Sequence, residues 1–288
     1  MQYLLLTVIL NALISAFLKW MDSYKVSALQ TIVCNYWVCV LSGLLFVGKW
    51  PANTTHALLS WWPWALLMGA AFILLFNLMA YITKVDGITT TNIANKLSLI
   101  IPVAFSVLLY HDHLGPLNIA GIILAFPAVY FTVRAQGQQQ GMANVWAPVV
   151  LFLGSGLLDT LVKYTQYSFL PAPDAQAIFL VVAFGAAGAI GFIVLFFQLM
   201  RGKVKWQWRA LLMGVLLGVP NFFSIYFLVR FLNTGIMQSA VAIPVNNLSI
   251  VVFTTLMAIV LFKEKLSPSR ILGLVLSVFA ILLIALGH

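Results

Sequence analysis

Residues 178–197 read IFLVVAFGAAGAIGFIVLFF, a run of 20 residues without a charged or amide side chain. The hydrocarbon core of a bilayer needs about 20 apolar residues for each helical span. Apolar and polar residues do not alternate in the run, as they would in a strand of an outer-membrane barrel. The stretch therefore predicts one membrane-spanning helix.

Comparable apolar stretches recur along the whole chain, separated by short interruptions. The chain is 63% hydrophobic and only 7% charged, so it lacks the charged surface that a soluble domain of this length needs. We therefore predict an all-α integral membrane protein of the cell membrane, embedded in the lipid bilayer. The ten predicted transmembrane helices are 2–18, 27–47, 62–83, 88–110, 116–133, 147–168, 175–199, 210–230, 235–262 and 269–286.

Basic residues are distributed unevenly between the loops. Only Lys49 and Arg230 follow even-numbered predicted helices. By the positive-inside rule the loops after odd-numbered helices face the cytoplasm, and both termini face outward. The net charge of +9 thus reflects the basic residues of the cytoplasmic loops. Because these residues set the membrane orientation, we expect no nucleic-acid partner. The basic residues after odd-numbered helices are Lys19, Lys25, Lys84, Arg134, Arg201, Lys203, Lys205, Arg209, Lys263, Lys265 and Arg270.

The chain repeats itself after about half its length. Residues 61–69 read WWPWALLMG and residues 206–214 read WQWRALLMG, at the starts of the predicted third and eighth helices. The repeat unit is five helices, so we predict repeats at 1–136 and 137–288. Because five is odd, the second unit enters the membrane from the opposite side. The two repeats are therefore expected to be inverted, as in secondary transporters.

The connections after the fourth and ninth predicted helices are also alike, and with the five-plus-five plan they resemble a known family. The chain is similar to the EamA-like branch of the drug/metabolite transporter superfamily. This resemblance implies a secondary transporter that acts without a cofactor or catalytic residues. Asp112 replaces the usual glutamate of the family, and the outward termini are opposite to the common family orientation. The residues that carry the resemblance are Pro102, Asp112, Leu114, Pro116, Glu264, Leu266 and Pro268.

Three charged residues fall inside predicted spans: Lys96, Asp159 and Lys163. A charge at mid-membrane costs at least about 2.5–3.5 kcal/mol on insertion scales, so each needs water, a partner or a function. Asp159 and Lys163 are four residues apart and could form an intrahelical ion pair, or one of them could titrate or bind solute during transport. Lys96 is either an anchor for a carboxylate or phosphate or a partner that reaches Asp159 from another helix.

Amides, hydroxyls and aromatics occupy further positions in the spans. Each could bond a neighbouring helix, but as a set they are expected to face inward and to line a polar cavity, because unpaired donors are costly against lipid. The predicted solute-binding residues are Lys96, Asn92, Asn95, Asn11, Ser15, Asn35, Trp37, Asn77, Tyr81, Asn221, Asn246 and Asn247.

These features favour a secondary transporter that moves a small polar metabolite by alternating access. The expected solute classes are anionic metabolites and amino acids. No Walker-type phosphate loop occurs, so we expect an ion gradient or counter-solute exchange to drive transport, with Asp159 as the residue that couples protons. The alternatives are an exporter of multiple drugs or lipophilic cations, and a membrane-embedded enzyme acting on a lipid-linked substrate. We expect no metal, and a monomer or dimer.

Overall fold

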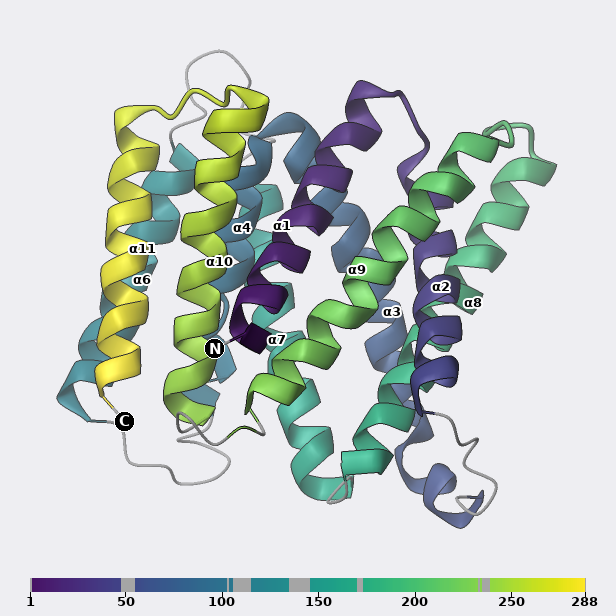
Figure 1. Cartoon of the computed structure of the whole chain (residues 1–288), viewed down its shortest axis with the longest axis horizontal. Helices are drawn as coiled ribbons and strands as arrows, with labels where there is room; N and C mark the ends of the chain where they lie inside the picture. The colour runs from purple at the N-terminus through teal and green to yellow at the C-terminus, as the bar shows by residue number, and fades with distance from the viewer. Residues whose placement is uncertain are drawn as a thin grey trace.

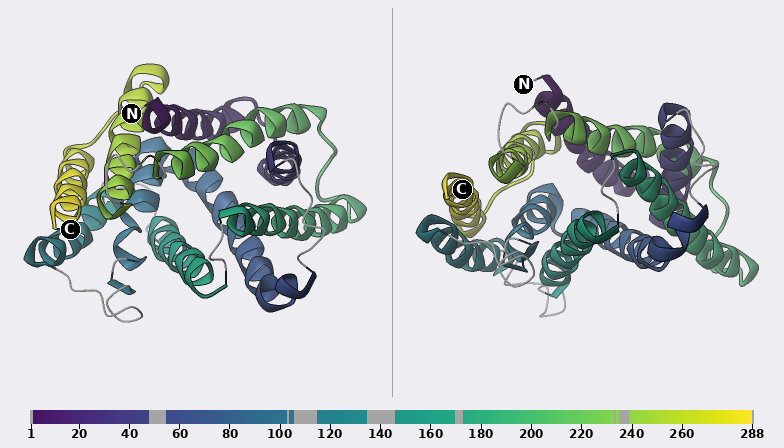
Figure 2. Two further views of the ribbon diagram at one scale, coloured as in Figure 1. Left: turned by 60° about the horizontal axis from the view of Figure 1, so that its bottom comes forward. Right: turned by 90° about the horizontal axis from the view of Figure 1, so that it is seen from below.

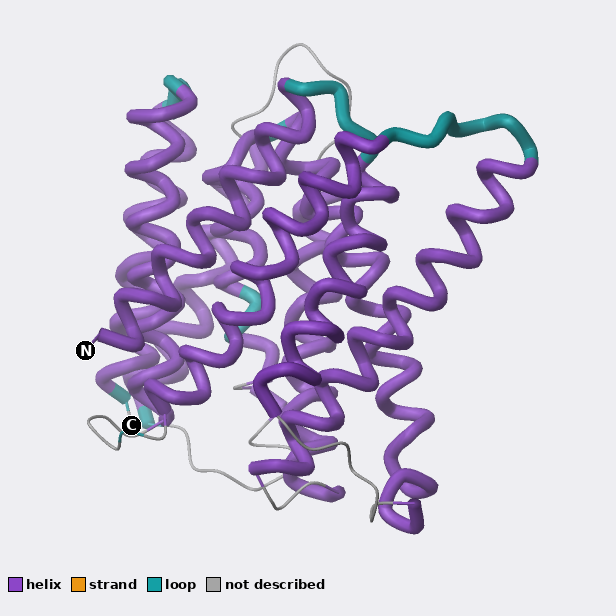
Figure 3. The backbone as a smooth tube through the Cα atoms, turned by 45° about the vertical axis from the view of Figure 1, so that its right-hand side comes forward, coloured by secondary structure: helices purple, strands orange, loops and turns teal. Residues whose placement is uncertain are grey.

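The computed structural model describes residues 2–47, 55–102, 104–105, 115–134, 146–169, 173–232, 234 and 239–287. Across these residues the chain is helical and contains no strand (Figure 3). The helices in this part of the chain are α1 (Gln2–Ser23), α2 (Ala28–Val47), α3 (Thr55–Val85), α4 (Gly87–Leu97), α6 (Pro116–Arg134), α7 (Trp146–Phe169), α8 (Pro173–Met200), α9 (Trp208–Leu232), α10 (Ser239–Phe262) and α11 (Pro268–Leu286).

Each of these ten helices overlaps one of the spans predicted from the sequence. Among the described residues, seven helical segments are long and apolar enough to cross a membrane. They form because a chain in lipid must satisfy its backbone N–H and C=O groups internally, and a helix does so within one segment. The protein is therefore a multi-pass membrane protein, as its composition predicts.

The fourth predicted helix differs from expectation. The sequence predicts one helix over 88–110, but α4 ends at Leu97 and two residues in a turn conformation follow. Pro102 has no N–H to donate to the carbonyl of Ser98 four residues earlier. That carbonyl instead accepts from the Ile101 N–H at 2.9 Å, so the helical hydrogen-bonding pattern is interrupted in the middle of the predicted span.

The connections after α1, α8 and α10 lie at one end of the molecule, the upper end in Figure 1, whereas both termini lie toward the other end. Asp22 and Lys84, near the ends of α1 and α3, form an ion pair at 2.8 Å, which places the end of α3 there too. Most of the loop lysines and arginines belong to these connections. We call this the basic end of the molecule.

Helices from the two predicted repeats interleave. The last helix of each, α6 and α11, pack together on one side of the molecule, and α2 packs against α8 and α9 on the other side (Figures 1 and 2). α4 contacts α10 and α7, and α1 contacts α9 and α10. The chain therefore forms one bundle in which α4 lies among helices from both repeats.

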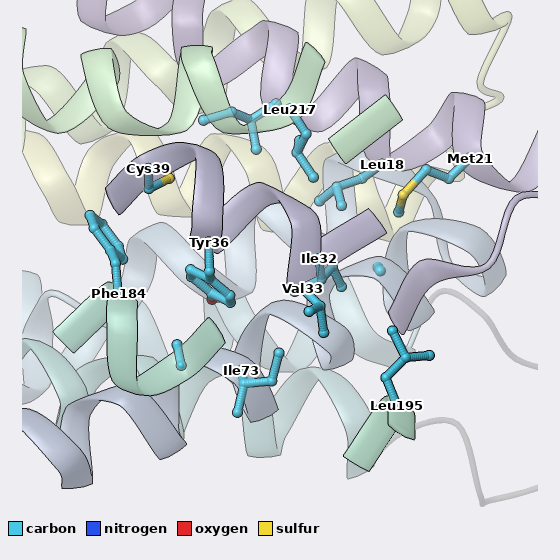
Figure 4. Packing of buried hydrophobic residues seen from close by; sticks show 13 residues of the cluster. Leu18, Met21, Ile32, Val33, Tyr36, Cys39, Ile73, Phe184, Leu195 and Leu217 are labelled. Atoms are coloured by element: carbon cyan, nitrogen blue, oxygen red, sulfur yellow. The ribbon is translucent and has the colours of Figure 1, made fainter. Parts of the chain in front are cut away.

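The largest apolar cluster joins α1, α2, α3, α8 and α9 (Figure 4). Tyr36 is only 1% exposed, and its ring stacks on Phe184 with the centroids 5.9 Å apart. Small residues let the backbones approach closely here: a Cβ atom added at Gly218 would lie 2.8 Å from the carbonyl oxygen of Asn35. This tight packing of α2 against α9 is typical of membrane helices, where van der Waals contact replaces the hydrophobic effect.

Candidate functional site

Two of the predicted polar residues meet where α4 crosses α1. The amide of Asn92 donates to the Ser15 hydroxyl oxygen at 3.0 Å and to the Ile88 carbonyl, also at 3.0 Å. The Ser15 hydroxyl lies 3.4 Å from the Asn92 amide oxygen. Both side chains are buried. The amide hydrogens of Asn92 are thus both used, and they tie α4 to α1.

Asn95 lies one turn further along α4 and contacts α7. Its amide donates to the Ser155 hydroxyl at 3.0 Å. Ser155 is buried, and Asp159 lies one helical turn further along the same face of α7, where it is exposed. These two bonds hold the polar face of α4 between α1 and α7, with Asp159 beside the contact.

Lys96 follows Asn95 directly and is partly exposed. Lys96 and Asp159 do not form a direct ion pair with one another. The side chain of Lys163 lies outside the described residues, and so does its predicted ion pair with Asp159. Neither Lys96 nor Asp159 thus has an ion-pair partner among the described side chains.

A second polar contact lies between α2 and α9, where Asn221 donates to the Asn35 amide oxygen at 3.2 Å. Asn35 is completely buried and its amide nitrogen has no hydrogen-bond partner among the described residues. The buried amide oxygen of Asn246, on α10, is also without one. A buried polar atom left unpaired is costly, so these atoms are positions where a solute or water would be stabilised.

The other predicted binding residues do not belong to these interhelical contacts. Asn11 donates to the Thr7 carbonyl at 2.9 Å and Asn77 to the Ile73 carbonyl at 2.7 Å, so each amide folds back on its own helix. The structure does not join these two amides to Lys96. The remaining members are Trp37, which is exposed and packs against Gly188, the exposed Tyr81 of α3, and the partly exposed Asn247 of α10.

Two contacts at the candidate site were not predicted from the sequence. Ser155 is not among the predicted binding residues, yet it is the partner of Asn95. Glu264 was noticed only as part of a family pattern, yet its carboxylate contacts the start of α4. The signal in the sequence was the helical spacing of Ser155 from Asp159 and the acidic residue of the repeated connection.

Metal-binding residues do not gather in the part of the chain that the structure describes: no group of three or more histidine, cysteine, aspartate or glutamate side chains occurs there. His111, Asp112 and His113 lie outside the described residues.

Helical packing and apolar spans define this chain as a multi-pass membrane protein. Residues 146–286 match the model of the EamA-like transporter family. These residues are therefore similar to an EamA-like transporter domain, in agreement with the resemblance found in the sequence.

Two further similarities extend beyond the matched domain. An uncharacterized protein of Haemophilus influenzae is 27% identical over 222 residues, which cover 76% of this chain and 74% of that protein. A solved crystal structure of another protein superposes with a TM-score of 0.62 at 17% identity, covering 99% of this chain and 96% of the other. At that identity the second similarity shows that the two proteins share a fold.

Proposed function

We propose that this protein is a secondary transporter that moves a small polar metabolite across the membrane by alternating access. The supporting observation is the arrangement of α4: its polar face is bonded to α1 through Asn92 and to α7 through Asn95, and it carries Lys96 without an ion-pair partner among the described side chains. Interrupted helices often form solute sites in transporters, and α4 is interrupted directly after Lys96.

In this proposal Lys96 anchors a carboxylate or phosphate of the solute, because an ammonium forms strong charge-assisted hydrogen bonds with such groups. Asn92, Asn95 and Ser15 orient the solute and hold the helices around it. The two five-helix units, 1–136 and 137–288, are proposed to be inverted repeats, which would give the two access states similar energies. A gradient of protons or of a counter-solute would drive the cycle.

A thermal-shift screen tests the anchor. Purified protein is screened against amino acids, organic anions, sugar phosphates, nucleotide sugars and lipophilic cations, because a ligand that binds the folded state raises the melting temperature. We expect an anionic metabolite to stabilise the wild type but not Lys96→Ala. The control is Lys203→Ala, which removes the same charge from an exposed connection and should keep the response. Equal stabilisation of all three proteins would make Lys96 a structural residue.

Asp159 supports a second candidate, an exporter of lipophilic cations, because it is an exposed acid within the bundle. The same screen separates the two functions. A cation that stabilises the wild type and Lys96→Ala, but not Asp159→Asn, would favour the exporter.

Asp159 also has a predicted role in coupling. With the solute identified, uptake into proteoliposomes is measured at several external pH values. We expect the pH dependence to be lost in Asp159→Asn, because an amide does not exchange protons, while exchange of solute for solute persists. A pH dependence identical to that of the wild type would assign coupling to another group.

A further inference from the structure

Glu264 makes a contact between two parts of the chain that are far apart in the sequence. It lies in the connection between α10 and α11, and its carboxylate accepts the backbone N–H of Ile88 at 3.1 Å. Ile88 is the second residue of α4, where backbone N–H groups have no partner within the helix. A carboxylate there also interacts favourably with the helix dipole. The second unit thereby holds the start of the helix that carries Asn92, Asn95 and Lys96.

The backbone around Glu264 sets the direction of its side chain. Lys263 adopts a left-handed conformation with φ 51°, and the Glu264 N–H donates to the Ala258 carbonyl at 3.0 Å. The chain therefore reverses sharply after α10. At the other end of the connection, the Ser267 hydroxyl accepts the Arg270 N–H at 3.3 Å and caps α11. The two turns hold Glu264 in a short, ordered connection.

Arg270, near the start of α11, also approaches the carboxylate. Its guanidinium lies 3.9 Å from Glu264, and the two side chains are only 12–13% exposed. A charged group with so little access to water is retained in a fold only when it has partners. One carboxylate oxygen of Glu264 accepts the Ile88 N–H of the other unit, whereas the second oxygen lies near the Arg270 guanidinium without a hydrogen bond among the described residues.

Gly87 makes the approach of the carboxylate possible. It has φ 91°, a conformation that side-chain-bearing residues rarely adopt. A Cβ atom added there would overlap the Glu264 carboxylate. The start of α4 and the α10–α11 connection are thus complementary in shape as well as in charge.

We propose that this contact is a latch that holds the basic end of the molecule closed and that opens when the solute pathway opens toward that side. The inference rests on the proposed function. The nearby ion pair of Asp22 with Lys84 and the bond from Lys19 to the Thr83 carbonyl join α1 to α3, within one unit. The Glu264 contact instead joins α4 to the second unit. Glu264 is a positioning residue, because it acts on the solute site through α4.

The test measures access to the site from each membrane face. Cys34 and Cys39 are replaced by alanine, and Ser155→Cys provides a reporter thiol of similar size opposite Asn95. Vesicles of each orientation are treated with a membrane-impermeant methanethiosulfonate. We expect Glu264→Ala to raise the labelling rate from the basic end about tenfold, the shift expected from losing one charge-assisted hydrogen bond in a two-state equilibrium.

Three further variants make the result specific. Gly87→Ala displaces the carboxylate from the α4 side and should raise labelling as Glu264→Ala does. Glu264→Gln keeps an oxygen acceptor and should raise it less. Lys265→Ala removes an exposed charge from the same connection and should leave labelling unchanged. If Glu264→Ala does not fold, the labelling rates of Gly87→Ala and Glu264→Gln test the latch instead.

Unchanged labelling in folded Glu264→Gln and Gly87→Ala would overturn the latch. Lower melting temperatures with unchanged labelling would have the same meaning, since a merely structural contact alters stability without altering access from one face. The labelling assay needs no solute. A screen without a stabilising solute would therefore count against the proposed function, whereas unchanged labelling counts against the latch alone.

Discussion

Buried amide side chains in this bundle differ in how many of their hydrogen-bonding atoms have partners. This difference separates amides that hold helices together from amides that still have an atom free to bind a solute. Asn92 uses both amide hydrogens, one on its own helix and one on Ser15 of another helix. Asn35 and Asn246 each retain an unpaired buried atom among the described residues. In lipid-embedded proteins such interhelical bonds contribute modestly, well under about 2 kcal/mol each. Asn92 therefore holds α4 against α1. The unpaired atoms of Asn35 and Asn246 are candidates for hydrogen bonds with a solute.

The role of Asn92 is testable by comparison with Asn11. Asn92→Ala removes an interhelical bond and leaves the Ser15 hydroxyl with one partner fewer, so we expect it to lower the free energy of unfolding by about 1–2 kcal/mol. Asn11→Ala removes only a bond to the carbonyl of its own helix and should cost less. Both are measured as unfolding in mixed detergent. Equal losses would show that the contact with Ser15 contributes nothing to stability.

At the scale of elements, two features give α4 and its neighbours their arrangement. Pro102 interrupts the helical hydrogen bonds and leaves α4 short, which places Lys96 in the last turn before the break. Glycines and other small residues let α2, α8 and α9 approach closely, so their positions depend on backbone contact. The site is consequently built on a short helix held by long, tightly packed ones.

Close packing predicts opposite outcomes for two helix glycines. A Cβ atom at Gly218 would lie 2.8 Å from the Asn35 carbonyl oxygen, whereas at Gly185 it would lie 3.9 Å from the nearest Val40 carbon. We expect Gly218→Ala to destabilise the protein by about 1–3 kcal/mol, because the backbones must separate. Gly185→Ala should be neutral or stabilising by up to about 1 kcal/mol, because alanine favours the helix. Melting temperatures of the two variants provide the measurement, and similar values would contradict the packing argument.

At the scale of the whole molecule, the connections after α1, α8 and α10 share one end, and this end carries most of the basic residues. An electrostatic asymmetry of this kind orients a membrane protein during insertion. The latch at Glu264 belongs to the same end, so the orientation also decides which compartment the latch closes off.

Orientation is measured directly with single cysteines in the background without Cys34 and Cys39. We expect Lys203→Cys, in the exposed connection between α8 and α9, to react with an impermeant thiol reagent only from the cytoplasmic side. A fluorescent tag that folds only in the cytoplasm should be dark when fused after the C-terminus. Reaction of Lys203→Cys from outside would reverse the predicted topology and the compartment assigned to the latch.

Much of this architecture follows from local physics and was therefore predictable. Every described helix falls on a predicted span, because an apolar segment in lipid must bond its own backbone. The outcome at Pro102 was not predictable in the same way, since a proline can kink a helix or end it. Here the Ile101 N–H donates to the Ser98 carbonyl and residues 100–102 are helical again, so the helix is interrupted rather than ended.

The sequence by itself determined a helical membrane protein, the positions of its spans, and the residue types placed inside the membrane. Only the tertiary structure decided that Asn92 bonds Ser15 and Asn95 bonds Ser155, while Asn11 and Asn77 turn back on their own helices. It also decided that Glu264 reaches α4. The reason is physical. In lipid each segment must satisfy its own backbone hydrogen bonds, so each helix forms independently of the others. The partner of a side chain depends instead on how neighbouring helices rotate and approach one another.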